Sequence, residues 1–98
     1  MKSKTYTKLY EWQTKARESD QECAKCHRKG LMTTDHIVPT SFLHLLGIQK
    51  ESYDDEWNYQ YLCRACNNLK ADRLDFTDDR TLKNLRRYID LAEFFYNH

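Results

Sequence analysis

Two pairs of cysteines, Cys23 with Cys26 and Cys63 with Cys66, constrain the fold of this chain more than any other feature. Each pair has the spacing C-x-x-C, which brings both sulfurs to one turn, about the bite that a tetrahedral metal requires. We expect no secretory signal, because the first residues lack an apolar stretch, and we therefore expect reduced thiols rather than disulfides. The four cysteines are therefore predicted to form one structural zinc site.

The length of 98 residues predicts a single domain over residues 1–98. A domain of this size buries little surface, so a metal staple is expected. The aromatic content of 13% favours a small core over disorder, and the net charge of +1 excludes a uniformly basic coat or histone-like protein. No apolar run approaches the roughly 20 residues of a membrane span, so we expect no membrane partner and a cytoplasmic location.

Other interpretations of the cysteines stay open. Residues 23–27 read C-x-x-C-H, the attachment motif of c-type haem, but haem attachment requires export and would leave the second pair without a role. Redox-active thiols are another interpretation, against which stand the two intact pairs and the lack of a fifth cysteine. His27 could also replace one cysteine as a zinc ligand.

Hydrophobic spacing and turn residues predict an α+β fold. The expected elements are a helix over 4–19, a knuckle over 20–30 with a turn at Gly30, a strand over 31–39, a helical turn over 41–47, a loop over 49–57, a strand over 58–62, a second knuckle running into a helix over 63–72, and a helix over 78–96. The last helix has a broad apolar face for packing, made of Leu82, Leu85, Tyr88, Ile89, Leu91, Ala92 and Phe95.

The residues between and after the knuckles carry the candidate chemistry. Asp35 and His36 place a carboxylate beside an imidazole, and Asn67 directly follows Cys66. A zinc that joins the knuckles would clamp a strand–strand–helix unit and bring Asp35, His36 and Asn67 together. The oxygens of Asp35 and Asn67 suit Mg²⁺ or Mn²⁺, and His36 can take a proton from an attacking water. This pattern predicts phosphodiester hydrolysis.

The sequence resembles the HNH endonucleases, which have the ββα-metal fold. The resemblance covers about residues 22–72 and rests on Cys23 and Cys26, the run Asp35-His36-Ile37-Val38-Pro39, Asn58, and the run Leu62-Cys63-Arg64-Ala65-Cys66-Asn67-Asn68-Leu69-Lys70. It implies a ββα-metal core held by the four-cysteine zinc site, with flanking helices over 4–19 and 78–96.

The resemblance also implies roles for individual residues. His36 is expected to be the general base, and Asp35 and Asn67 are expected to hold a catalytic Mg²⁺, Mn²⁺ or other divalent metal. Asn58 is expected to pin the loop between the strands through side-chain hydrogen bonds. The implied reaction cuts DNA and leaves 5′-phosphate and 3′-hydroxyl ends. The long segment 40–57, and Asn67 where the family often has His, depart from the family pattern.

Basic and acidic residues around this motif suggest further contacts. Lys70, Arg73 and Arg64 are predicted phosphate contacts, with a solvated surface as the alternative. An acidic stretch consists of Glu51, Asp54, Asp55 and Glu56. It is predicted to be a solvated loop, or else to face away from DNA and dock a partner protein.

Two rival functions remain at this point. One is a zinc-stapled DNA-binding module without catalysis. The other is a partner-dependent subunit of a phage packaging or restriction assembly, a setting that the resemblance suggests because small members of the family often come from phages and mobile elements. From the resemblance we expect a protein of a bacterial host cell or a phage-encoded protein.

Overall fold

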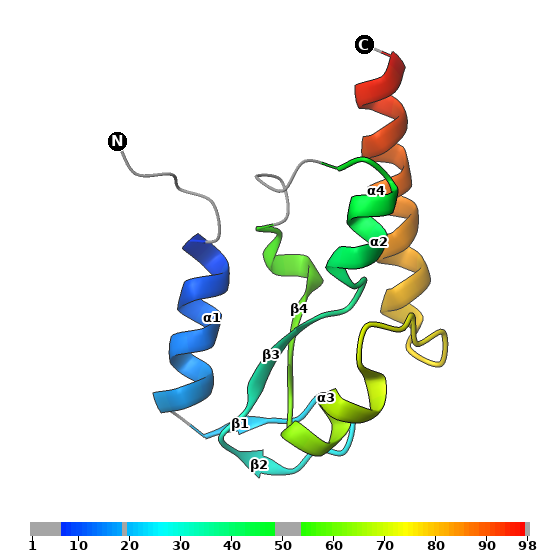
Figure 1. Cartoon of the computed structure of the whole chain (residues 1–98). Coiled ribbons are helices and arrows are strands. Elements are labelled where there is room, and N and C mark those ends of the chain that lie inside the picture. Colours follow the sequence, from blue (N-terminus) through cyan, green and yellow to red (C-terminus); the bar gives the residue numbers. More distant parts are fainter. Residues whose placement is uncertain (1–6, 19, 49–53, 98) are drawn as a thin grey trace.

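The computed structural model of the chain describes residues 7–18, 20–48 and 54–97, with side chains as far as Phe94. It confirms an α+β fold of helices and two small antiparallel sheets (Figure 1). The elements in chain order are α1 (Thr7–Glu18), β1 (Gln21–Glu22), β2 (Lys29–Gly30), β3 (Thr33–His36), α2 (Thr40–Leu45), the 3₁₀ helix η2 (Glu56–Asn58), β4 (Tyr59–Leu62), α3 (Arg64–Lys70) and α4 (Asp79–Asn97). Within these ranges, no helix combines the length and the apolar character needed to cross a membrane.

A two-stranded ribbon of β3 and β4 forms the centre of the fold (Figure 1). The strands are antiparallel, with Asp35 opposite Gln60 and His36 opposite Tyr59. Because successive side chains of a strand point to opposite faces, Asp35 and Gln60 share one face and His36 and Tyr59 share the other. Helix α1 packs on the face of Tyr59, where its Trp12 ring meets the Tyr59 ring, and α3 packs on the opposite face.

The first cysteine pair lies in the loop of a β-hairpin that the sequence did not predict. Strands β1 and β2 pair Gln21 with Gly30, so Gly30 belongs to a strand rather than to the expected turn. The backbone N–H of Ala24, between the two cysteines, donates to the carbonyl of Tyr61 over 2.8 Å. This bond joins the hairpin loop to β4.

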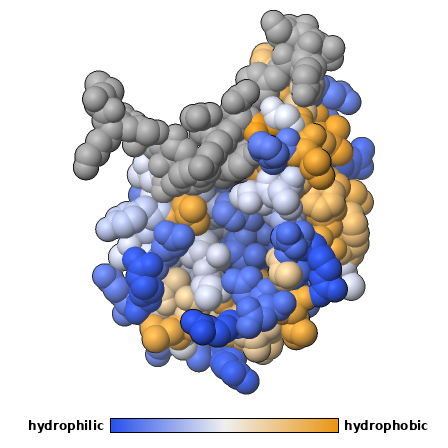
Figure 2. Space-filling view, in the orientation of Figure 1, coloured by the Kyte–Doolittle hydropathy of each residue, from blue (hydrophilic) through white to orange (hydrophobic). Residues whose placement is uncertain are grey.

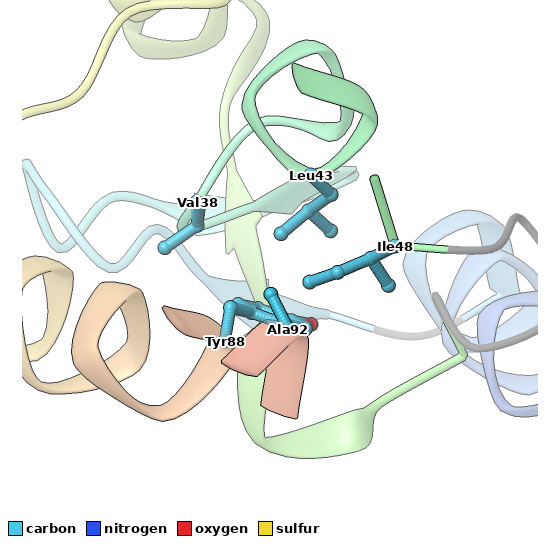
Figure 3. Close-up of a cluster of buried hydrophobic side chains, with 5 residues drawn as sticks. All are labelled: Val38, Leu43, Ile48, Tyr88 and Ala92. Atoms are coloured by element: carbon cyan, nitrogen blue, oxygen red, sulfur yellow. The ribbon is translucent and has the colours of Figure 1, made fainter. Parts of the chain in front are cut away.

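Two separate clusters of buried side chains stabilise the fold. The first joins α2 and α4 to the end of β3 (Figure 3), and its members are Val38, Leu43, Ile48, Tyr88 and Ala92. The second lies around the cysteine pairs and consists of Ala16, Cys23, Met32, Leu62 and Cys63. The long segment after Pro39 therefore supplies Leu43 and Ile48 to the first core.

The prediction for the apolar face of α4 was partly wrong. Leu82 is 53% exposed and Ile89 is 37% exposed, whereas Thr81 and Asn84 are buried beside Tyr88. Both polar residues have partners: the Thr81 hydroxyl donates to the carbonyl of Asp75 over 2.6 Å, and Asn84 donates to neighbouring carbonyls. Hydrogen bonding removes the cost of burying a polar group, so these positions face the core while apolar side chains gather on the outer surface along α4 (Figure 2).

The solvated-loop prediction was wrong for Asp54. Its carboxylate accepts hydrogen bonds from the backbone N–H groups of Lys8 and Leu9, both over 2.8 Å, and from the Tyr59 hydroxyl over 2.7 Å. The first N–H groups of a helix have no partner within the helix. Asp54 therefore caps α1 from a segment about half the chain away.

The neighbouring acids are also engaged. Asp55 accepts a hydrogen bond of 2.9 Å from the Tyr88 hydroxyl of α4, and Glu56 accepts one of 3.0 Å from the Trp12 indole of α1. Glu51 lies outside the described residues. The acidic segment thus fastens both flanking helices to the ribbon.

Candidate functional site

The four cysteines converge on one point of the structure. Their Sγ atoms all lie within 4.8 Å of one another, and those of Cys26 and Cys63 are 3.8 Å apart. A zinc ion with Zn–S bonds of about 2.3 Å has sulfur–sulfur edges of about 3.8 Å. The cluster therefore has the dimensions of a four-sulfur zinc site, and no other such group of His, Cys, Asp or Glu occurs in the described part of the chain.

The thiols of this cluster do not ionise equally by themselves. Burial disfavours the thiolate of Cys23, but backbone N–H donors, chiefly that of Cys26, outweigh it and lower the pKa of Cys23 to about 6. The hydrogen bond with Cys63 raises the pKa of Cys66 to about 12. Four thiolates so close together require a cation, and a divalent zinc could supply it.

Two local structures position the sulfurs. Cys23 and Cys26 lie in the loop between β1 and β2, while Cys63 directly precedes α3 and Cys66 lies in its first turn. His27 does not join the cluster, because its ring Nδ1 contacts Glu22 over 2.9 Å at the surface. The convergence of all four sulfurs also argues against haem attachment at the first pair alone.

Helix α3 brings two predicted site residues against β3. The Asn67 amide donates to the Thr33 hydroxyl over 2.6 Å, and one turn later the Lys70 ammonium lies 3.0 Å from the Asp35 carboxylate. Thr33 and Asp35 share a face of β3 because they are two residues apart. Asp35 and Asn67 therefore lie in the same interface between α3 and the ribbon.

The Asp35 carboxylate is held in a fixed orientation. It is 8% exposed, and its Oδ2 accepts a hydrogen bond of 2.9 Å from Gln60 Nε2. The amide oxygen of Gln60 in turn accepts one of 2.6 Å from Arg80, which is paired with Asp78 at the start of α4. A chain of polar contacts thus runs from α4 to Asp35.

His36 is not brought into this interface. Its ring packs edge-on against Tyr59, with 5.1 Å between the centroids, on the opposite face of the ribbon from Asp35. Its Nε2 is buried and finds no hydrogen-bond partner among the described residues. Burial lowers the pKa of His36, which favours the neutral imidazole.

Asn58 joins the end of β3 to the start of β4. Its amide oxygen accepts from the N–H of Val38 over 3.0 Å, and its amide nitrogen donates to the carbonyl of Val38 over 3.1 Å. Asn84 of α4 adds a third contact, 3.2 Å to the same amide oxygen. These contacts join the backbone at Val38 to the start of β4 and to α4.

The predicted phosphate contacts differ in their surroundings. Arg64 is exposed at the start of α3. Arg73 is also exposed, and its guanidinium donates to the carbonyls of Leu69 and Lys70 at the end of α3. Lys70 is nearly buried, with 9% of its side chain exposed, and its ammonium contacts Asp35.

Sequence reasoning missed four residues that support the site: Thr33, Gln60, Arg80 and Asn84. Gln60 carried a signal, because it shares a strand face with the apolar Leu62, where a polar residue needs a buried partner. The partners of Thr33 and Asn84, and the contact of Arg80 with Gln60, come from elements far away in the sequence. No local pattern could have identified them.

Comparison with protein-family models matches residues 23–73 to the HNH endonuclease family. The match covers half of the chain and includes both cysteine pairs, the Asp35-His36 dipeptide, Asn58 and Asn67. The chain therefore belongs to the HNH endonuclease family, and membership supports endonuclease activity on DNA. Searches of curated proteins and of solved structures found no match.

Proposed function

We propose that this chain is a metal-dependent endonuclease that hydrolyses phosphodiester bonds of DNA, with residues 1–98 acting as one domain. The observation that carries the proposal is the packing of α3 against β3, with Asn67 beside Thr33 and Lys70 beside Asp35. In the proposal, zinc at the four cysteines holds this interface together. Reduced thiolates suit a reducing compartment such as the cytoplasm.

The donor set fits a hard divalent cation. Asp35 offers a carboxylate whose hydrogen bonds both fall on Oδ2, so Oδ1 is the atom that could ligate a metal. Asn67 uses its amide nitrogen toward Thr33, so its amide oxygen is the second ligand. Oxygen donors of this kind suit Mg²⁺ or Mn²⁺, which supplies Lewis-acid stabilisation of the phosphate when bound.

His36 acts as the general base in this proposal. Its Nε2 takes a proton from water as the water oxygen forms a bond to phosphorus and the bond from phosphorus to the 3′ oxygen breaks. The departing 3′ oxygen takes a proton from solvent, so the ends are 5′-phosphate and 3′-hydroxyl. To receive the proton, the imidazole must turn from its contact with Tyr59 toward the face of Asp35.

Asn58 and the basic residues have supporting roles. Asn58 fixes the backbone at Val38, two residues after His36, and so limits the positions open to the imidazole. Arg64 and Arg73 are exposed on or next to α3 and can contact phosphates that flank the bond to be cut.

A DNA-binding module without catalysis is the second candidate. Two observations favour it: the ammonium of Lys70 contacts the Asp35 carboxylate, and His36 faces away from that carboxylate. Such a module would bind duplex DNA with the same zinc-stapled unit and would leave the backbone intact.

Supercoiled plasmid distinguishes the candidates. Zinc-loaded protein should nick it in Mg²⁺ or Mn²⁺, and EDTA added briefly enough to leave the zinc bound should stop the reaction. An Asn67→Ala variant should lose most nicking, whereas Asn68→Ala, on the exposed neighbour, should retain it. The binding module would be supported instead if the protein bound the plasmid DNA without a divalent metal and never nicked it, either alone or with candidate partner proteins.

A further inference from the structure

Lys70 forms an ion pair with Asp35 that is nearly buried. Its ammonium lies 3.0 Å from Asp35 Oδ2 and donates to the carbonyl of His36 over 2.9 Å. The side chains of Lys70 and Asp35 are 9% and 10% exposed. The attraction within a charge pair that has so little contact with water is weakly screened.

We propose that Lys70 is the resident counter-cation of Asp35 and that it sets the affinity of the site for a divalent metal. This inference rests on the proposed function, in which Asp35 is a metal ligand. A divalent ion bound to Asp35 would repel the Lys70 ammonium, which lies 3.0 Å from the Asp35 carboxylate. Lys70 must therefore leave the carboxylate, or share it, before Asp35 can ligate the metal.

The structure gives Lys70 a place to move. Lys70 and Gln60, the two residues that bind Asp35 Oδ2, both line a pocket of about 390 Å³. Lys25, Arg73 and Arg80 line the same pocket, and Lys25 and Arg80 are paired there with Asp75 and Asp78. A DNA phosphate near the pocket would be the new partner of the released ammonium. DNA and metal would then favour the binding of each other, as coupled ligands must.

Gln60 keeps Asp35 oriented while Lys70 moves. Its amide nitrogen binds Asp35 Oδ2, and its amide oxygen is held by Arg80. The carboxylate therefore retains one neutral hydrogen bond after the ammonium has left. Lys70 supplies charge, and Gln60 supplies orientation.

Mn²⁺ binding to zinc-loaded, DNA-free protein tests the proposal without a measurement of cleavage. Calorimetry or the electron paramagnetic resonance of free Mn²⁺ gives the dissociation constant. Lys70→Met should bind Mn²⁺ on the order of tenfold more tightly than wild type, and Lys70→Arg, which keeps the charge, should stay near wild type. Lys83→Met removes the same charge from an exposed position on α4 and should have little effect. Lys70→Gln replaces Lys70→Met if the latter does not fold, as judged by zinc content and thermal unfolding.

Asp35→Asn separates this inference from the proposed function. Loss of Mn²⁺ binding in Asp35→Asn together with a gain in Lys70→Met would support the counter-cation. Loss in Asp35→Asn with unchanged or weaker binding in Lys70→Met would overturn the inference and leave Asp35 as a metal ligand. Unchanged binding in Asp35→Asn would overturn both, because the metal would then lie elsewhere.

Discussion

The two buried clusters of this protein differ in what holds them together. The cluster around Tyr88 is an ordinary apolar core in which Val38, Leu43 and Ile48 meet α4 (Figure 3). The cluster around the cysteines contains Cys23 and Cys63 themselves and few large side chains. Apolar packing can stabilise the first, whereas we expect the second, with so little apolar surface, to depend on a bound metal.

This difference matters for function because the site lies between the two clusters. Asp35 and Asn67 belong to the β3 and α3 elements next to the cysteine cluster. Asn58 is held from the other side by Asn84 of α4. The comparison predicts that loss of zinc first disorders the interface that contains Asp35 and Asn67. Loss of apolar packing should instead first weaken the hydrogen bonds of Asn58.

Zinc removal should have the largest effect. Cys66→Ser, like Cys23→Ser, should unfold the domain, because structural zinc contributes apparent folding free energy on the order of 10 kcal/mol in small domains. Zinc content and thermal unfolding followed by circular dichroism measure this. A Cys66→Ser protein that stays folded without zinc would show that the two clusters do not differ in the way described.

Truncation of the apolar core should have a smaller effect that leaves zinc bound. Tyr88 is fully buried, its ring lies 4.8 Å from that of Trp57, and burial raises its pKa well above the usual range. Tyr88→Ala should lower the free energy of unfolding by about 3–5 kcal/mol, measured by urea denaturation. Tyr88→Phe, which loses the hydroxyl alone, should cost about 1 kcal/mol. If the Tyr88→Ala protein stayed folded but lost its zinc, the two clusters would not be independent of each other.

Loss of the α1 cap should have the smallest effect of the three. Asp54→Ala should lower the free energy of unfolding by about 1–2 kcal/mol and increase hydrogen exchange in α1. Glu56→Gln should cost less, because its bond to Trp12 is exposed. Equal stability of wild type and Asp54→Ala would restore the interpretation of this segment as a solvated loop.

Low pH should weaken the same cap. Burial opposes ionisation of Asp54, but its hydrogen bonds with Tyr59, Lys8 and Leu9 outweigh burial and lower its pKa below the usual 3.8. A lowered folded pKa means that this stabilisation is complete above the unfolded pKa and is lost as the pH falls through the folded value. The difference in stability between wild type and Asp54→Ala should therefore shrink below a pH of about 4.

The sequence predicted the parts of the fold that depend on local patterns. The C-x-x-C spacing predicted the sulfur cluster, and periodicity predicted helices close to α1 and α4. A helix was also expected to continue from the second cysteine pair, where α3 lies. The sequence did not predict the hydrogen bonds of Asp54 to α1, the burial of Thr81 and Asn84, or the contact of Lys70 with Asp35. Each of these depends on how segments far apart in the chain pack, and an exposed polar residue has the same sequence signal as a buried polar residue with a partner.

The roles of the site residues stay predictions for the same reason. The positions of Asp35 and Asn67 follow from the strand and helix that carry them. Strand alternation places the adjacent side chains of Asp35 and His36 on opposite faces. The contact of His36 with the Tyr59 ring depends on the pairing of β3 with β4, which the dipeptide Asp35-His36 does not reveal. Whether His36 turns toward Asp35 is therefore the central question for catalysis.

A comparison of His36→Ala with His44→Ala tests the central claim most directly. Both variants lose one imidazole, but His44 lies exposed on α2, away from the Asp35–Asn67 interface. With zinc bound and Mg²⁺ or Mn²⁺ present, plasmid nicking should fall at least about 100-fold in His36→Ala and stay near wild type in His44→Ala. Equal nicking by His36→Ala and wild type would contradict the account, because the base would then be another group.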